Sequence, residues 1–219
     1  MTADNFATHY RSRHGFAMEG SIARWYAKIT QKSMWQYRSW AKKASDNVAL
    51  VGSVLEVAPG QGYLSIELAK LGDYRIIGMD ISHTMVKIAQ EKAGAAGVQV
   101  EFRQGDAHNI PFADDSFDFA ICTAAFKNFP EPLRVLKTNG KVLIIDLRRN
   151  TSSKEIKEGV DAMGLSMIDS IITKLTFKYM LLKTAYTADE IRELASRSKF
   201  AKCRILEGPM GMEISLEKR

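Results

Sequence analysis

Apolar and polar positions follow two different periods along this chain, and together they predict an α/β fold. Apolar residues three or four positions apart predict helices over 62–70 and 83–95; Ser82 is a suitable N-cap for the second, and Gly94 and Gly97 are expected to end it. Because strands separated by helices pair in parallel through right-handed crossovers, we expect a doubly wound, mostly parallel sheet. The apolar runs that predict its strands are 53–57, 75–79, 98–102, 117–122 and 141–146.

Two further segments have helical spacing and lie outside this alternation. Residues 16–43 carry a stripe of aromatic and aliphatic side chains, which is expected either to pack on the sheet or to face a substrate. Residues 151–185 are rich in Met and Lys and are expected to form an insertion above the strand ends. The sequence therefore predicts an N-terminal helical cap at 1–47 and one domain at 48–219 that includes this cap insertion.

The C-terminal part of the chain has local signals for its own elements. Thr187 and Glu190 match a capping box at the start of a helix. Residues 203–207 and 213–217 alternate around a Gly-Pro-Met-Gly turn, which predicts an antiparallel β-hairpin. The connection before the fifth strand is short, with a helix expected over 133–137.

Composition limits the class of protein. A chain of 219 residues with 46% hydrophobic and 26% charged residues can form one globular α/β domain. Two cysteines, no basic-then-apolar start and no apolar run of about 18 residues favour a reducing, cytoplasmic location without a membrane span. The net charge of +6 comes from the flanks, while 48–147 is net negative. The basic flanks are either solvated helix faces or a cap that attracts an anionic substrate or surface.

Three acidic residues lie at corresponding places in the predicted sheet. Glu56 ends the first strand, Asp80 ends the second, and Asp106 follows the third. Ligands of open parallel sheets bind at the carboxyl ends of the strands, so we expect the three carboxylates to line one cleft. A glycine-bearing turn at 58–62 and a helix follow the first strand, which is the geometry that holds nucleotide-like ligands.

One class of enzyme that this geometry suggests is a dinucleotide-dependent oxidoreductase. Residues 60–65 read G-x-G-x-x-S, and Asp80 lies about 20 residues further on, as a ribose-binding acid should. However, Ser65 replaces the third glycine, and Glu56 places a negative charge under the loop. That charge suits a cationic ligand better than a pyrophosphate.

The chain resembles the class I S-adenosylmethionine-dependent methyltransferases, of the subgroup similar to the ubiquinone/menaquinone C-methyltransferases. Four segments in order carry the resemblance: 54–62 (VLEVAPGQG), 79–82 (MDIS), 105–118 (GDAHNIPFADDSFD) and 138–146 (TNGKVLIID). The resemblance implies a Rossmann-like, seven-stranded sheet with a C-terminal antiparallel hairpin and helical cap segments. Two departures are Ala58, where the family usually has glycine, and the short 127–140 stretch.

The resemblance also implies S-adenosyl-L-methionine as cofactor and assigns its binding residues. Glu56 would lie beneath the methionyl ammonium, and the backbone at 58–62 would approach the methionyl part. Asp80 would accept hydrogen bonds from the ribose hydroxyls, and Asp106 from the adenine amino group. Ile81 would pack on the adenine. The full set of implied cofactor residues is Glu56, Ala58, Gly60, Gly62, Asp80, Ile81, Asp106, Ala107 and Thr123.

Methyl transfer from a sulfonium is an in-line displacement, so the main task of the protein is to align two reactants in a dry site. A general base is needed only where the acceptor must lose a proton. Candidate bases are His9, Tyr10, His14 and Tyr26 in the N-terminal cap, although for each of them the sequence favours a surface or packing side chain over a catalytic one. No His, Cys or carboxylate cluster has metal-ligand spacing, so no metal is expected.

The acceptor is expected to be a small molecule. The Met-rich segment can repack around a flexible apolar group, and Lys174, Lys178 and Lys183 favour an acceptor that also carries an anionic group. Two other classes remain open. A nucleic-acid methyltransferase would suit the sequence pI of about 9.2, but no Asn-Pro-Pro-Tyr-type motif follows the fourth strand. A non-catalytic cofactor-binding protein would suit the short 127–140 stretch. The acceptor atom and the oligomeric state are left open.

Overall fold

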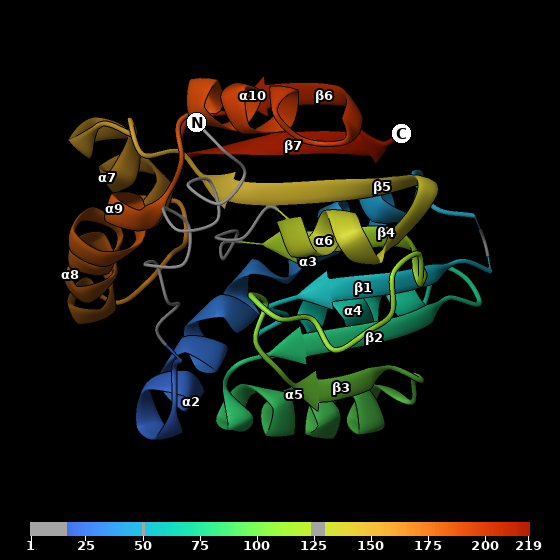
Figure 1. Cartoon of the computed structure of the whole chain (residues 1–219). Helices are drawn as coiled ribbons and strands as arrows, with labels where there is room; N and C mark the ends of the chain where they lie inside the picture. The colour runs from blue at the N-terminus through green and yellow to red at the C-terminus, as the bar shows by residue number, and fades with distance from the viewer. Residues whose placement is uncertain (1–16, 50, 124–129) are drawn as a thin grey trace.

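A seven-stranded sheet forms the centre of the computed structural model, which describes residues 17–49, 51–123 and 130–219 (Figure 1). The strand order is β3-β2-β1-β4-β5-β7-β6, with β7 antiparallel to both of its neighbours. This confirms the predicted fold class, including the closing hairpin. The strands are β1 (Ser53–Val57), β2 (Arg75–Asp80), β3 (Glu101–Gln104), β4 (Phe117–Thr123), β5 (Leu136–Leu147), β6 (Phe200–Glu207) and β7 (Gly211–Lys218).

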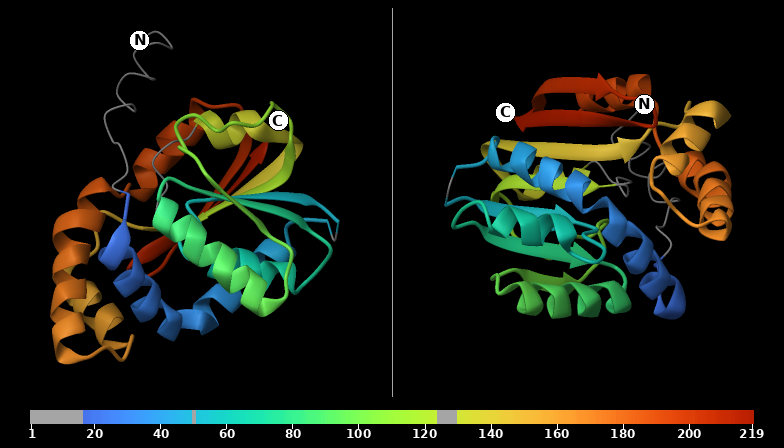
Figure 2. Two further views of the ribbon diagram at one scale, coloured as in Figure 1. Left: turned by 90° about the horizontal axis from the view of Figure 1, so that it is seen from below. Right: turned by 180° about the vertical axis from the view of Figure 1, so that it is seen from behind.

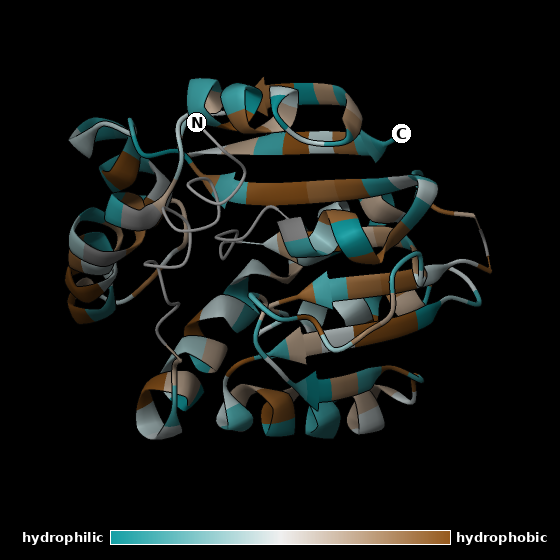
Figure 3. Ribbon diagram, in the orientation of Figure 1, coloured by the Kyte–Doolittle hydropathy of each residue, from teal (hydrophilic) through white to brown (hydrophobic). Residues whose placement is uncertain are grey.

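Helices cover both faces of this sheet (Figure 2). Ala41, in the helix Met34–Ser45, and Leu64, in the helix Tyr63–Ala69, share an apolar cluster on one face. Val135 and Ile191 belong to the cluster on the other face. The central strands β1, β2, β4 and β5 are therefore largely apolar on both sides, and Figure 3 shows a hydrophobic run along β5. The helices are α2 (Gly20–Thr30), η1 (Gln31–Ser33), α3 (Met34–Ser45), α4 (Tyr63–Ala69), α5 (His83–Ala96), α6 (Pro130–Val135), α7 (Ser153–Asp161), α8 (Met167–Thr176), η2 (Phe177–Leu181, a π-helical turn), α9 (Leu182–Thr184) and α10 (Ala188–Ser196).

Two predicted helix caps are confirmed. The Ser82 hydroxyl accepts a hydrogen bond from Met85 N at 3.0 Å and begins α5. Thr187 and Glu190 form a complete capping box at the start of α10. Such caps satisfy backbone donors that the first helical turn leaves unpaired, which is why short local patterns predict them well.

The third strand was predicted too early. The structure has it at 101–104 instead of 98–102, because the end of α5 uses the backbone of Val98. Gly97 adopts a left-handed φ of 66°, and Val98 N donates to Ala93 O at 3.2 Å. This reverse turn directs the chain away from the helix before the strand can begin. Gly94 lies inside α5, so the prediction that it helps to end the helix is wrong.

The fifth strand is longer than predicted and irregular. It begins at Leu136, which pairs with Phe117, whereas Lys141 pairs with Phe119. The surplus residues between these pairs form a bulge in which Asn139 has a φ of 62°. The helix expected at 133–137 therefore lies at 130–135 instead.

The carboxyl ends of the parallel strands point toward one side of the molecule, where α2 and α7 to α9 also lie (Figure 1). The helical pattern over 16–43 forms two helices joined by the η1 turn. Trp25 on α2 donates to the Asp169 carboxylate on α8 at 3.2 Å, and Lys32 donates to Gly164 O at 3.4 Å. The N-terminal helices and the 151–185 segment therefore touch each other. That they act as caps stays a prediction.

Candidate functional site

The loop between β1 and α4 has an unusual backbone. Ala58, Gly60 and Gly62 all have positive φ, at 55°, 55° and 77°. A Cβ on Gly62 would lie 2.6 Å from Phe102 Cζ, so this position requires glycine. A Cβ on Gly60 would meet nothing within 4 Å. The loop is therefore packed closely at its end and open at its middle, where a ligand can approach the main chain.

Asp80 holds this loop in place from the end of β2. The side chain is buried, and one carboxylate oxygen accepts from Gly60 N at 3.0 Å. The other oxygen accepts from Ser82 N at 2.8 Å. Burial raises the pKa of Asp80, while both backbone hydrogen bonds act in the opposite direction. The carboxylate thus connects the β1 loop to the start of α5.

Glu56 is more deeply buried and less well satisfied. Only 1% of the residue is exposed, and Oε2 accepts hydrogen bonds from both the amide and the hydroxyl of Ser65. Oε1 has no hydrogen-bond partner among the described residues. Burial raises the pKa of Glu56 to about 7, although the Ser65 bonds oppose the shift. An orphaned buried acceptor favours a ligand that brings a cationic donor.

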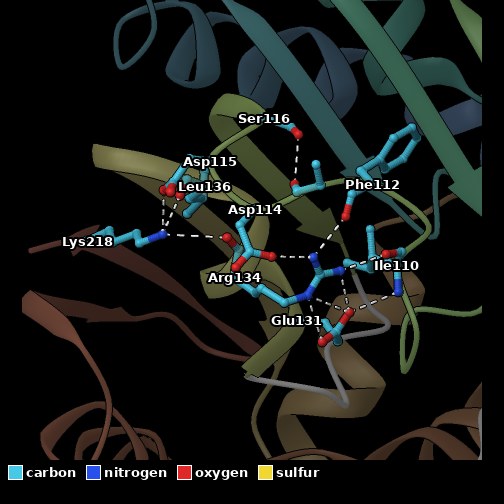
Figure 4. A network of polar contacts seen from close by, with 10 residues as sticks. Ile110, Phe112, Asp114, Asp115, Ser116, Glu131, Arg134, Leu136 and Lys218 are labelled. Atoms are coloured by element: carbon cyan, nitrogen blue, oxygen red, sulfur yellow. Dashed lines mark hydrogen bonds and ion pairs between the residues drawn. The ribbon is translucent and has the colours of Figure 1, made fainter.

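Asp106 follows β3 in a loop that α6 fixes. His108 donates its backbone N–H to Asp106 Oδ1 at 2.9 Å, and its ring Nδ1 lies 2.8 Å from the same oxygen. Arg134 on α6 donates to Ile110 O at 2.7 Å and to Phe112 O at 2.8 Å (Figure 4). The loop that carries the third acid is therefore tied to α6, the helix that directly precedes β5.

Comparisons with known proteins agree with this geometry. Residues 54–145 match the family model described as a methyltransferase domain. The demethylmenaquinone methyltransferase of Desulfitobacterium hafniense is 37% identical over 145 residues, covering 60% of this chain and 57% of that protein. The UbiE C-methyltransferase of ubiquinone/menaquinone biosynthesis from Geotalea daltonii is 27% identical over 179 residues, covering 74% and 73%. The sequence of the chain is thus similar to that of methyltransferases.

Solved structures share the fold of this chain. A Methanococcus maripaludis protein described as a putative S-adenosylmethionine-dependent methyltransferase has a TM-score of 0.72 at 23% identity. The superposition covers 94% of this chain and 96% of that protein. One from Aquifex aeolicus has a TM-score of 0.63 at 19% identity and covers 88% and 98%. The chain spans about half the length of the first curated relatives that it matches, from 40% to 57%.

The residues expected to bind S-adenosylmethionine lie at or near neighbouring strand ends. Glu56 and Asp80 lie on neighbouring strands, because β1 and β2 pair in parallel with Glu56 opposite Gly78, two residues before Asp80. Ile81 is 40% exposed directly after Asp80, and Thr123 is half-buried at the end of β4. Ala107 packs against the core cluster that includes Met79. Their individual roles toward the cofactor stay predictions.

The predicted general bases are placed less favourably. His9, Tyr10 and His14 lie outside the described residues. Tyr26 lies on α2, and burial raises the pKa of its hydroxyl. A raised pKa makes the phenolate less accessible at neutral pH, which counts against Tyr26 as a proton acceptor.

Sequence reasoning missed a contact between the cofactor loop and the N-terminal helices. Gln61 Nε2 donates to Thr30 Oγ1 at 2.8 Å and to Tyr37 OH at 3.1 Å. Its own Oε1 is buried without a described partner. Glu19 similarly accepts from His83 N at 2.9 Å at the start of α5. These contacts join residues far apart in the sequence, so no local pattern could have indicated them.

Within the part of the chain that the structure covers, no cluster of three or more His, Cys, Asp or Glu side chains could hold a metal ion. The helices described there are also too short or too polar to cross a membrane.

Proposed function

We propose that this protein transfers a methyl group from S-adenosylmethionine to an apolar small-molecule acceptor. The observation that supports this best is the pair of buried carboxylates beneath an open, left-handed loop. Glu56 Oε1 has no described partner, and Asp80 lies at the end of the next strand. A ligand with both an ammonium and a ribose complements this pair, whereas a pyrophosphate would be repelled by it.

The residues of the chain would bind and orient the two reactants. The bound cofactor supplies a methyl group on a sulfonium, which needs no further activation. Glu56 would ionise beside the methionyl ammonium, because a nearby positive charge favours the carboxylate over the buried acid. Asp80, fixed by its bond from Gly60 N, would accept from the ribose hydroxyls. Alignment in a site closed to water then accounts for most of the rate, as it does for in-line displacements in general.

The relatives support an acceptor that resembles demethylmenaquinone, since that compound names several of them. The anionic group expected on the acceptor has two candidate partners. Lys174 donates a hydrogen bond to the Asp161 carboxylate at 2.7 Å, so it is not one of them. The two candidates are Lys178 and Lys183, which lie beside the Tyr179 ring.

Calorimetric titration with S-adenosylhomocysteine tests the proposal. The wild-type chain should bind it, and Asp80→Asn should weaken binding by about 30-fold to 100-fold, since charge-assisted hydrogen bonds are lost. Asp73→Asn, on an exposed turn before β2, is the matched control and should bind like the wild type. Equal binding by the two variants, or no binding by the wild type, would contradict the proposal. If the chain bound S-adenosylhomocysteine but methylated no member of a panel of demethylated quinones, a non-catalytic cofactor-binding protein would be favoured. Methylation of RNA or DNA would show that the acceptor is a nucleic acid instead of a small molecule.

A further inference from the structure

The α8 helix and the η2 turn expose a continuous apolar stripe. Its members are two adjacent pairs and two single residues that recur three or four positions apart, so they share one face. They are Met167 (81% exposed), Ile168 (72%), Ile171 (54%), Ile172 (42%), Leu175 (51%) and Tyr179 (53%). Single exposed apolar residues are common on proteins, but six on one helical face form a patch of the kind that marks a binding surface.

The stripe is not a core face that happens to be uncovered. The opposite side of the same segment attaches it to the protein: Thr173 is 6% exposed, and Phe177 packs against the cluster of Ile156, Val160 and Leu182. The N-terminus of α8 is capped by Ser166, which accepts from Asp169 N at 3.2 Å. The helix is therefore fixed on its inner side and presents the stripe outward.

Two lysines border the stripe. Lys178 lies within the η2 turn, next to Tyr179, and Lys183 lies in α9 directly after that turn. Both lie beside the Tyr179 ring, with Nζ 5.4 Å and 5.8 Å from its centroid. Neither forms an ion pair with a carboxylate of the described residues. An apolar helical face flanked by lysines matches the charge and polarity of an anionic lipid surface.

We propose that α8 and η2 dock on the surface of an anionic lipid bilayer. The stripe enters the boundary between headgroups and acyl chains, and Lys178 and Lys183 pair with lipid phosphates. A second copy of the chain fits the same stripe less well, because a two-fold contact would bring the lysines of both copies together. The α8 helix lies on the side where the parallel strands end (Figure 1), so docking would turn that side toward the bilayer. The docking does not require methyl transfer, although Lys178 and Lys183 are also the candidate partners of an anionic group on the acceptor.

Sedimentation of the full-length chain with vesicles tests the docking. The wild type should bind vesicles of phosphatidylcholine with a quarter phosphatidylglycerol, bind pure phosphatidylcholine less, and lose affinity as salt is added. Leu175→Gln should weaken the partition coefficient by about five-fold. Leu206→Gln is the matched control, because Leu206 on β6 is 50% exposed against 51% for Leu175. The pair Lys178→Glu and Lys183→Glu should lose at least about 20-fold on the anionic vesicles, whereas Lys87→Glu on α5 should lose far less.

A label on the stripe distinguishes the possible occupants. Ile168→Cys in a Cys203→Ser background carries a bimane dye, whose emission shifts to the blue in apolar surroundings. A shift that needs anionic vesicles supports docking. A shift that grows with protein concentration alone identifies a second copy, and a shift in the dilute chain without lipid identifies coverage by the chain itself. Either of these two results, or equal vesicle binding by Leu175→Gln and the wild type, overturns the proposal.

Discussion

Replacement of Arg134 by methionine should destabilise this protein far more than the same exchange at an exposed arginine. Arg134 is the centre of a network that joins α6 to the loop after β3 (Figure 4). Its Nη1 donates to Phe112 O and to the Asp114 carboxylate, each at 2.8 Å. Its Nη2 donates to Ile110 O at 2.7 Å and to Glu131 at 2.8 Å. Methionine keeps the length of the apolar stem and removes every donor.

The magnitude follows from the exposure of each partner. Asp114 is 70% exposed, so its bond contributes on the order of 0.5 kcal/mol. Glu131 is 19% exposed, and the carbonyls of Ile110 and Phe112 are left without their guanidinium donor. Three such bonds at about 1 kcal/mol each give a loss near 3 kcal/mol in the free energy of unfolding. For a chain of this size, that lowers Tm by about 6–12 °C.

Thermal and urea unfolding measure this loss directly. Arg134→Lys should recover about half of the stability, since an ammonium keeps the charge but cannot reproduce the planar fork. The matched control is Arg192→Met, because Arg192 is 54% exposed and pairs with the 93% exposed Asp189. It should cost less than about 0.5 kcal/mol. If Arg134→Met melted within a degree or two of the Arg192 variant, the network would not hold the loop.

Three further predictions test the cofactor loop and the acids beneath it. Ala58→Gly should stabilise the fold by up to about 1 kcal/mol in thermal melts, because alanine is strained at a φ of 55°; a lower Tm would contradict this. Burial raises the pKa of Glu56 from 4.5 to about 7, so the unfolded chain ionises before the folded one as pH rises. The wild type should therefore lose about 3 kcal/mol of unfolding free energy relative to Glu56→Gln between pH 4.5 and pH 7, and no more above pH 7. Stability profiles of the two proteins that run parallel over this range would refute the prediction. Gly78→Ala should cost about 1–3 kcal/mol in urea unfolding, since its Cβ would lie 2.5 Å from Phe102. Gly94→Ala, with open space in α5, should instead be neutral or stabilising.

Predictions from the sequence succeeded where the signal was local. The caps at Ser82 and Thr187 depend on residues three positions apart, and both are present. The strand that contains Glu56 and the strand that ends at Asp80 are short apolar runs, and their predicted bounds agree closely with the structure. The placement of these two acids at neighbouring strand ends follows from parallel pairing, which the alternation of elements already implied.

Predictions failed where the end of one element forms hydrogen bonds with residues that were predicted to begin the next element. Val98 has the alternating pattern of a strand, but its N–H closes the end of α5. Residues before Lys141 contain a turn signal, yet they form a bulge inside β5 because Leu136 already pairs with Phe117. The bond from Gln61 to Thr30 and the fork of Arg134 are long-range, and no spacing in the sequence encodes them.

The two acids at the strand ends are satisfied to different degrees, and this difference gives them different tasks. Both are buried, and burial raises the pKa of each, so ionising either one in the empty protein opposes folding. Asp80 recovers part of this cost through two backbone donors, which also fix the loop. Glu56 keeps one oxygen without a described partner. A cation that binds there relieves a penalty already present in the fold, so part of its binding free energy should come from the protein itself. The Glu56→Gln variant should therefore be more stable than the wild type when empty at pH 8, and should gain less stability from S-adenosylhomocysteine.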